Sequence, residues 1–214
     1  MRELTGEKLE KELERLEAMS VYEKEYSSIP FICGVDEAGR GPLAGPVAAG
    51  AVVLPEGIRI LHLNDSKKVS AKRRELLFRE IAEKAVSFHV GIVPAERVDE
   101  INILQATYEA MRLAVDGLSV KPGLFLNDAV VIPGIEPEKQ VKIIHGDAKS
   151  ISIAAASIMA KVTRDRMMEE YDRLWPEYGF AKHKGYGTAE HIAAIRKYGP
   201  CPIHRRTFLK SILG

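Results

Sequence analysis

The chain has 214 residues, of which 46% are hydrophobic, and a formal net charge of +1 at pH 7. This length suffices for one sizeable hydrophobic core, and two cysteines without a Cys-x-x-Cys pair exclude a disulfide-built scaffold. No segment approaches the roughly 20 apolar residues that cross a bilayer, and the densely charged N-terminus does not resemble a signal peptide. We therefore expect a soluble, cytoplasmic protein without a membrane association.

The charges are distributed unevenly along the chain. Residues 1–26 hold five Lys or Arg against eight Asp or Glu, a net −3, whereas residues 142–214 hold thirteen against seven, a net +6. A basic C-terminal third suits a ligand with a phosphate backbone. The simpler alternative is a solvated surface with surplus lysine.

An amphipathic helix is predicted first, because Leu9, Leu13 and Leu16 recur at helical spacing among Glu and Lys. We treat residues 1–28 as an N-terminal helical extension and residues 29–214 as the main domain.

The main domain begins with two apolar runs that flank a loop of glycine and proline, which predicts two adjacent strands. The elements that follow are a helix over 71–85, a strand over 86–93, a helical stretch to residue 118, short strands at 124–127 and 141–144, a long helix from 150 to about 175, and a shorter helix over 188–198. Strands that alternate with helices predict an α/β fold, with a mixed β-sheet flanked by α-helices.

Acidic residues follow three of the predicted strands: the pair Asp36 and Glu37, then Asp128, then Asp147. Strand ends on one edge of a sheet converge, and carboxylates gathered there repel one another unless divalent cations lie between them. Oxygen ligands favour Mg²⁺ or Mn²⁺ over zinc, and one or two such ions could bind. Helix or turn capping by Asp128 and Asp147 is the structural alternative.

Asp36 and Glu37 are adjacent, so their side chains face opposite ways on a regular strand. Both can reach one site only if the backbone turns there, where the predicted strand ends.

Two other patterns argue against a nucleotide-binding loop and a zinc site. The loop from Gly39 to Gly45 lacks the spacing of a dinucleotide or ATP cradle, although its glycines allow a ligand to approach the backbone closely. Cys201 and His204 are spaced like half a zinc site without a second half, so we interpret them as structural.

Five motifs in order along the chain resemble bacterial type 2 ribonuclease H, also called ribonuclease HII. They are Val-Asp-Glu-Ala-Gly-Arg-Gly-Pro-Leu-Ala-Gly over 35–45, Asp-Ser-Lys-Lys over 65–68, Gly-Asp-Ala-Lys-Ser over 146–150, the small-residue run over 152–165, and His-Lys-Gly-Tyr-Gly-Thr over 183–188.

The resemblance implies a ribonuclease H-like fold and an endoribonuclease that hydrolyses the RNA strand of RNA–DNA hybrids. It also implies cutting on the 5′ side of ribonucleotides embedded in duplex DNA, which leaves 3′-hydroxyl and 5′-phosphate ends and removes misincorporated ribonucleotides and RNA primers. The four carboxylates Asp36, Glu37, Asp128 and Asp147 would bind Mg²⁺ or Mn²⁺ and catalyse the cut. Asp128 is the loosest match, because its flanking residues are the least distinctive.

The resemblance further implies that the Gly39-Arg40-Gly41 loop reads the 2′-hydroxyl, aided by Tyr186. An aromatic ring against the sugar agrees with this role, whereas an ordinary half-buried tyrosine is the structural alternative. The expected phosphate contacts are basic side chains within these motifs or near them: Lys67, Lys68, Arg164, Lys182, Lys184 and Arg205.

Two other functions remain open. One is another metal-dependent phosphodiesterase with the same carboxylate site, and the other is a nucleic-acid-binding module without catalysis, which would not need four convergent acids. Nothing in the sequence demands more than a monomer.

Overall fold

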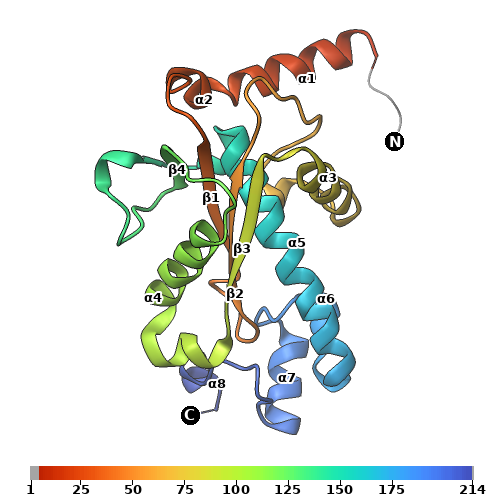
Figure 1. Ribbon diagram of the computed structural model, residues 1–214. Coiled ribbons are helices and arrows are strands. Elements are labelled where there is room, and N and C mark those ends of the chain that lie inside the picture. The colour runs from red at the N-terminus through yellow and green to blue at the C-terminus, as the bar shows by residue number, and fades with distance from the viewer. Residues whose placement is uncertain (1–4, 214) are drawn as a thin grey trace.

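Five strands form one mixed sheet in the order β3-β2-β1-β4-β5 (Figure 1). In the computed structural model, which describes residues 5–213, the strands are β1 Ile32–Ala38, β2 Val47–Val53, β3 Ser87–Val93, β4 Leu124–Asp128 and β5 Gln140–Ile143. The β1-β2 and β2-β3 pairs are antiparallel, whereas β1-β4 and β4-β5 are parallel. Residues 1–4 of the predicted extension lie outside the described part.

Helices cover both faces of this sheet (Figure 1). They are α1 Glu7–Ala18, α2 Val21–Glu25, α3 Ala71–Lys84, α4 Ala95–Asp116, α5 Ile151–Leu174, α6 Phe180–His183, α7 Ala189–Tyr198 and α8 Lys210–Leu213. The helix α4 packs on one face, α3 and α5 pack on the other, and α6 to α8 gather beyond one end of the strands. The predicted α/β fold with a mixed sheet flanked by helices is confirmed.

Alternation along the strands decides which side chains meet which helix. Cys33 and Val35 of β1 are fully buried in the core that includes Met111 of α4. Gly34, between them, faces the opposite way, toward α5. Asp36 therefore shares the α5 face of β1 with Gly34.

The long helix α5 lies unusually close to the sheet, because glycines and small side chains meet at the contact. A Cβ built on Gly34 would lie 2.1 Å from the carbonyl carbon of Ser152, and one on Gly50 would lie 2.4 Å from the carbonyl oxygen of Ala156. Only residues without a Cβ fit there. This close packing brings the N-terminus of α5 down onto β1 and β4.

The N-terminal helices pack on the body. Leu16 of α1 and Met19 lie in the same buried cluster as Leu77 and Ile81 of α3. Three short helices, α2, α6 and α8, were not expected from the sequence, and α4 is interrupted by a kink at Asn102, whose φ is 67°. Within residues 5–213, no helix combines the length and apolar character needed to cross a bilayer.

Candidate active site

Three of the predicted acids meet in one place. Carboxylate oxygens of Asp36, Asp128 and Asp147 lie within 4.8 Å of one another, and Asp36 and Asp147 are buried. Among the residues that the structure describes, this is the one group of three or more potential metal ligands at such spacing.

Strand alternation and register explain why these acids converge. Val35 of β1 pairs with Asn127 of β4, so Asp36 and Asp128 follow side by side on neighbouring parallel strands. Both belong to the face that α5 covers, since Leu126 of β4 packs against Ile153 of α5. Asp147 joins them from the single 3₁₀ turn Gly146–Ala148, which leads into α5.

The backbone around the acids is held in unusual conformations. Ala129, directly after Asp128, has φ of 55°, and His145, just before the 3₁₀ turn, has φ of 59°. Such left-handed conformations are costly for residues other than glycine and persist where the surroundings enforce them. Here the Gly146 amide donates to Asp128 Oδ1 at 2.7 Å, which ties the end of β4 to the turn that carries Asp147.

Burial and mutual repulsion raise the pKa of each of the two buried acids. The pKa of Asp36 is raised well above its usual value by burial first and then by the charges of Glu37 and Asp128, against a hydrogen bond from Ser157. Burial also raises the pKa of Asp147 to about 6, with further contributions from Asp65 and Asp128. Carboxyl groups in this state gain stability when a cation replaces the missing counter-charge.

Glu37 lies outside this three-oxygen group. It sits next to Asp36 on β1, whose pairing with β2 continues regularly through Ala38, so no turn in the backbone brings the two side chains onto the same face. A Glu37 carboxylate oxygen instead pairs with Arg40 Nη1 at 3.2 Å. Its charge nevertheless raises the pKa of Asp36, which places it at the margin of the site.

This donor set suits a hard divalent cation. All three converging ligands are carboxylates, and no described histidine or cysteine joins them within the same spacing. Oxygen-only ligation is typical of Mg²⁺, Mn²⁺ and Ca²⁺ sites and unlike that of structural zinc. The cluster therefore fits a divalent metal site.

The glycine loop lies beside the cluster and is held by two buried guanidinium groups. Arg205 is fully buried and donates to the carbonyl oxygens of Gly39, Arg40 and Gly45 at 2.6 to 3.1 Å. Arg164, which is 1% exposed, donates to three further carbonyl oxygens, those of Ala44, Pro46 and Lys184. Tightly held carbonyls of this kind give the loop one conformation.

The structure contradicts the prediction that Arg164 and Arg205 contact phosphates. Both side chains direct their donors at backbone carbonyls inside the protein, so neither presents a guanidinium to a ligand. Sequence alone suggested the surface, because unpaired arginine is rarely buried. Burial here is offset by hydrogen bonds from each guanidinium to several carbonyl oxygens.

Tyr186 faces the same loop. Tyr186 is 46% exposed, and its Cε1 lies 3.7 Å from where a Cβ would stand on Gly41. The ring therefore lies against the loop backbone at Gly41.

The remaining basic residues differ in exposure and in whether they form close ion pairs. Lys67 Nζ lies 4.0 Å from Asp147 Oδ2 while its side chain is 82% exposed. Lys68 is also exposed, whereas Lys182 pairs with Glu190 at 2.7 Å and Lys184 with Glu169 at 2.6 Å. Lys67 and Lys68 are thus the better placed of the predicted phosphate contacts.

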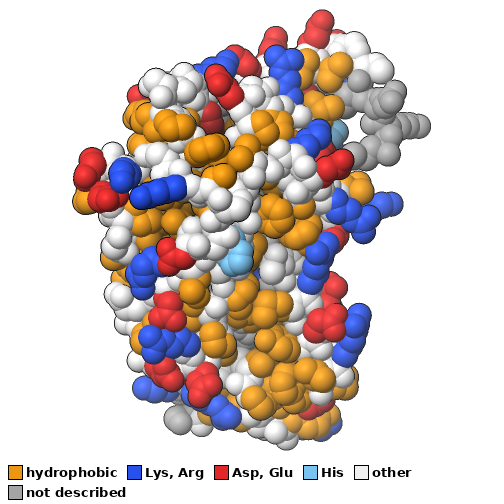
Figure 2. All heavy atoms as spheres, viewed as in Figure 1, with side chains coloured by type: hydrophobic (Ala, Val, Ile, Leu, Met, Phe, Trp, Pro, Cys, Tyr) orange, Lys and Arg blue, Asp and Glu red, His pale blue; other side chains and the backbone are white. Residues whose placement is uncertain are grey.

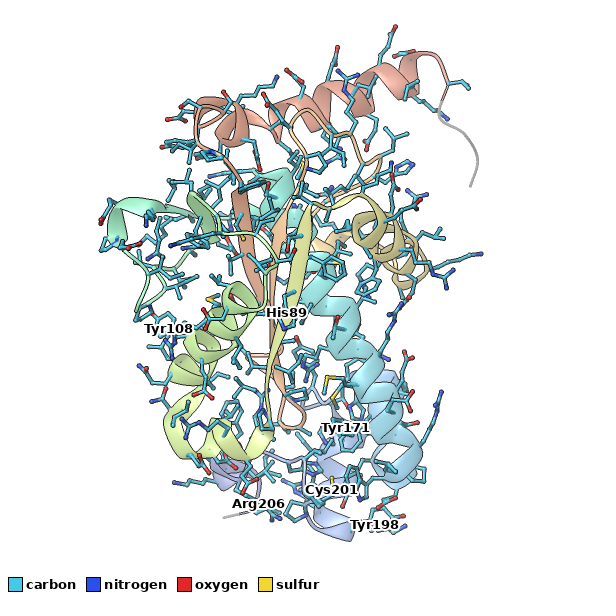
Figure 3. All side chains as sticks on the ribbon, in the orientation of Figure 1. His89, Tyr108, Tyr171, Tyr198, Cys201 and Arg206 are labelled. Carbon is cyan, nitrogen blue, oxygen red and sulfur yellow. The ribbon has the colours of Figure 1, made fainter. Side chains whose placement is uncertain are left out.

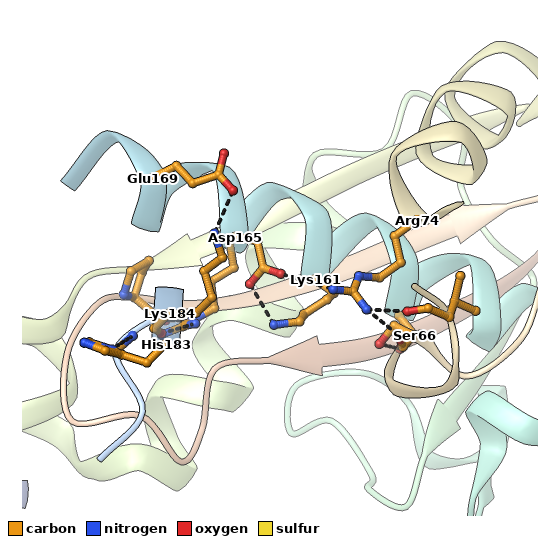
Figure 4. A network of polar contacts seen from close by, with 12 residues as sticks. Ser66, Arg74, Lys161, Asp165, Glu169, His183 and Lys184 are labelled. Carbon is orange, nitrogen blue, oxygen red and sulfur yellow. Dashed lines mark hydrogen bonds and ion pairs between the residues drawn. The ribbon is translucent and has the colours of Figure 1, made fainter. Parts of the chain in front are cut away.

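Figure 4 shows the polar network along α5 that includes the Lys184–Glu169 pair. Arg74 of α3 donates to the carbonyl oxygen of Ser66 at 2.9 Å, and Asp165 pairs with Lys161 at 2.7 Å. The network anchors the turn that carries Lys67 to the same helix whose N-terminus follows Asp147.

Two residues at this site were not predicted from sequence. Asp65 is buried, accepts a hydrogen bond from the Lys67 amide at 2.9 Å and raises the pKa of Asp147. Ser157 lies five residues along α5 from Ser152, hydrogen bonds with Ser66 at 2.9 Å and lowers the pKa of Asp36. Both belong to motifs that the resemblance uses, but their roles depend on tertiary contacts.

Comparison with known proteins identifies a family for this chain. The family model described as Ribonuclease HII matches residues 33–211. A ribonuclease HII of Lachnoclostridium phytofermentans is 58% identical over 96% of this chain and 81% of its own length. One from Caldanaerobacter subterraneus is 55% identical over 96% of this chain and 86% of its own length.

A solved structure supports the fold independently. The crystal structure of the ribonuclease H2 from Pyrococcus horikoshii superposes with a TM-score of 0.67 at 30% identity, covering 82% of this chain and 92% of that one. The five-stranded sheet order and the convergent carboxylates are thus found on a chain with extensive similarity to this family. This protein belongs to the ribonuclease HII family of endoribonucleases.

Proposed function

We propose that this protein hydrolyses the RNA strand of RNA–DNA hybrids and cuts on the 5′ side of ribonucleotides embedded in duplex DNA. The products carry a 3′-hydroxyl and a 5′-phosphate, and the catalytic part is the domain over residues 29–214. Such an activity removes misincorporated ribonucleotides and RNA primers. The observation that carries the proposal is the convergence of Asp36, Asp128 and Asp147 within 4.8 Å in a chain of this family.

Asp36, Asp128 and Asp147 would hold one or two Mg²⁺ or Mn²⁺ ions, and Glu37 would complete the set from the margin of the site. Bound divalent ions activate water and stabilise the leaving oxygen of a phosphodiester. The protein's own contribution is to fix the carboxylate oxygens: the Gly146 amide orients Asp128, and strand register sets Asp36 beside it.

Lys67 and Lys68 hold the substrate backbone at the rim of the acids. Lys67 is near enough to Asp147 to be drawn toward the cluster and exposed enough to reach a phosphate oxygen. Although partial burial opposes it, the pKa of Lys67 is raised by the charges of Asp65 and Asp147, so it stays protonated. Lys184 contributes only when a phosphate competes with Glu169 for it.

Recognition of the ribonucleotide falls to the Gly39-Arg40-Gly41 loop and Tyr186. A 2′-hydroxyl both donates and accepts hydrogen bonds, which matches backbone groups in a loop that lets a ligand approach closely. Arg205 holds this loop in one conformation, and the Tyr186 ring borders it at Gly41. We propose that the protein acts as a monomer.

The test compares Asp36→Asn with wild type on a duplex that contains one ribonucleotide, in the presence of Mg²⁺. We expect at least about a thousandfold loss of cleavage with binding retained, because the loss of one central ligand disrupts the metal site. Asp116→Asn, at the exposed end of α4, is the matched control and should cleave normally.

The same assay separates the alternatives. An all-deoxy duplex should remain uncut, and the products from the ribonucleotide substrate should map to its 5′ side. Equal cleavage of both duplexes would indicate a general metal-dependent phosphodiesterase. Full activity of Asp36→Asn would remove Asp36 from the site.

A further inference from the structure

Tyr186 is held at its main chain by a side chain that no catalytic step uses. The Tyr186 carbonyl oxygen accepts hydrogen bonds from the Thr188 amide at 2.8 Å and from His191 Nδ1 at 2.9 Å. His191, in the first turns of α7, is fully buried. Because a carbonyl oxygen only accepts, His191 must carry its proton on Nδ1.

The partner of His191 has the opposite tautomer, also set by a backbone group. The Cys201 amide donates to His204 Nδ1 at 3.0 Å, so that nitrogen carries no proton and the proton is on His204 Nε2. His204 Nε2 lies 3.0 Å from His191 Nε2. His204 Nε2 therefore donates this hydrogen bond, and His191 Nε2 accepts it.

Burial keeps both rings in these neutral forms. Burial lowers the pKa of His191 and that of His204 to about 4. A third histidine, His183, stacks on His191 with ring centroids 4.4 Å apart and accepts the Gly185 amide. Figure 3 places Cys201, the start of the chain of hydrogen bonds, among the C-terminal elements beyond the end of the sheet.

We propose that His191, oriented by His204, is a positioning residue that sets the height of the Tyr186 ring over the Gly39-Arg40-Gly41 loop and so contributes to recognition of the ribose. The inference rests on the proposed role of Tyr186. Backbone groups fix the orientation of both histidine rings. The Cys201 amide fixes the tautomer of His204, and the Tyr186 carbonyl fixes that of His191. Loss of the Nδ1 donor leaves the Tyr186 carbonyl with the Thr188 amide alone and frees the segment to shift.

The test is a double-mutant cycle with wild type, His191→Ala, Tyr186→Ala and the double variant. Each enzyme cleaves a duplex with one ribonucleotide, and kcat and KM are measured separately. His191→Ala should lower kcat about tenfold, which is the factor that corresponds to losing one hydrogen bond, with KM nearly unchanged because phosphate contacts dominate binding. In the Tyr186→Ala background the same change should cost less than about twofold, because the ring it positions is absent.

The outcomes separate the inference from the proposed function. If Tyr186→Ala cleaves like wild type, the role of Tyr186 as reader fails, and the inference fails with it. If Tyr186→Ala is impaired and His191→Ala costs the same factor in both backgrounds, only the inference is overturned.

Two further variants guard against a general loss of folding. His191→Asn keeps an N–H near the Nδ1 position and should retain most of the cleavage that His191→Ala loses, in the same cycle with Tyr186→Ala. Equal losses for Asn and Ala would contradict a donor role. His89→Ala, on the exposed edge strand β3, is the histidine control and should match wild type in kcat and in thermal midpoint.

Discussion

The acids of the candidate active site destabilise the folded protein. Asp147 is buried beside Asp128 and Asp65, and its pKa of about 6 means that ionising it in the folded state is harder than in the unfolded chain. A raised carboxyl pKa contributes stability below the unfolded value near pH 4, and this contribution is lost as the pH rises to about 6. At neutral pH without metal, the repulsion is therefore fully present.

We expect Asp147→Asn to be more stable than wild type when divalent ions are removed with EDTA at pH 7. The thermal midpoint should rise by about 2–4 °C, the shift that roughly 1 kcal/mol produces in a chain of this size. At pH 4, where the wild-type carboxyl is protonated, the two midpoints should coincide. Circular dichroism at both pH values makes the measurement, and a gain that persists unchanged at pH 4 would show that repulsion is not its source.

At the scale of elements, residues of the N-terminal segment accept hydrogen bonds from the start of α5. Glu23 of α2 accepts hydrogen bonds from Ser150 Oγ at 2.5 Å and from the Ser152 amide at 3.0 Å. The carbonyl oxygen of Met19 accepts from the Ile151 amide at 3.0 Å. Amides in the first turn of a helix lack partners within it, so an acceptor there stabilises the helix. The residues so held directly follow the turn that carries Asp147.

Glu23→Ala should therefore lower both the thermal midpoint and cleavage. Loss of a helix-capping contact costs about 1–2 kcal/mol, or roughly 4 °C in a chain of this size, and cleavage should fall several-fold as Asp147 becomes less well held. Glu23→Gln keeps an acceptor oxygen and should cleave nearly as wild type does. Glu25→Ala, exposed on the same short helix, serves as the control. Full cleavage by Glu23→Ala would limit these helices to a role in stability.

At the scale of the whole molecule, basic and acidic side chains are interspersed on the face that Figure 2 shows. On the face of Figure 2, Lys and Arg alternate with Asp and Glu along both sides, with hydrophobic side chains between them. Many of the basic groups are in ion pairs, such as Lys182 with Glu190. We expect the duplex to contact the molecule where Lys67 and Lys68 flank the acids.

Binding to that duplex should weaken as salt rises, because each phosphate contact releases counterions. For Asp36→Asn, which binds without cutting, affinity should fall about 10- to 100-fold between 50 and 200 mM salt if about two to four phosphates are contacted. Lys67→Ala should flatten the dependence by about one contact. Lys84→Ala, at the end of α3, should leave it unchanged, and fluorescence anisotropy across the salt series distinguishes these cases.

Periodicity and topology allowed much of this structure to be predicted from sequence. Two apolar runs that flank a glycine and proline loop located β1 and β2, and acids after successive strands indicated a shared site. Roles that depend on tertiary contacts were not accessible. Arg164 was expected at the surface because a charge is usually solvated, and the bond between His204 and His191 depends on how the C-terminal segment folds back.

The hydrogen bonds from Arg205 to the glycine loop can form only late in biosynthesis. The loop over residues 39–45 leaves the ribosome early, yet the guanidinium that holds its carbonyls arrives about 160 residues later. At about 5–20 residues per second, translation leaves the loop without this partner for roughly ten to thirty seconds. Until Arg205 is made, the loop proposed to read the 2′-hydroxyl lacks the contacts that hold it in one conformation, so the proposed discrimination between ribose and deoxyribose requires the last segment of the chain.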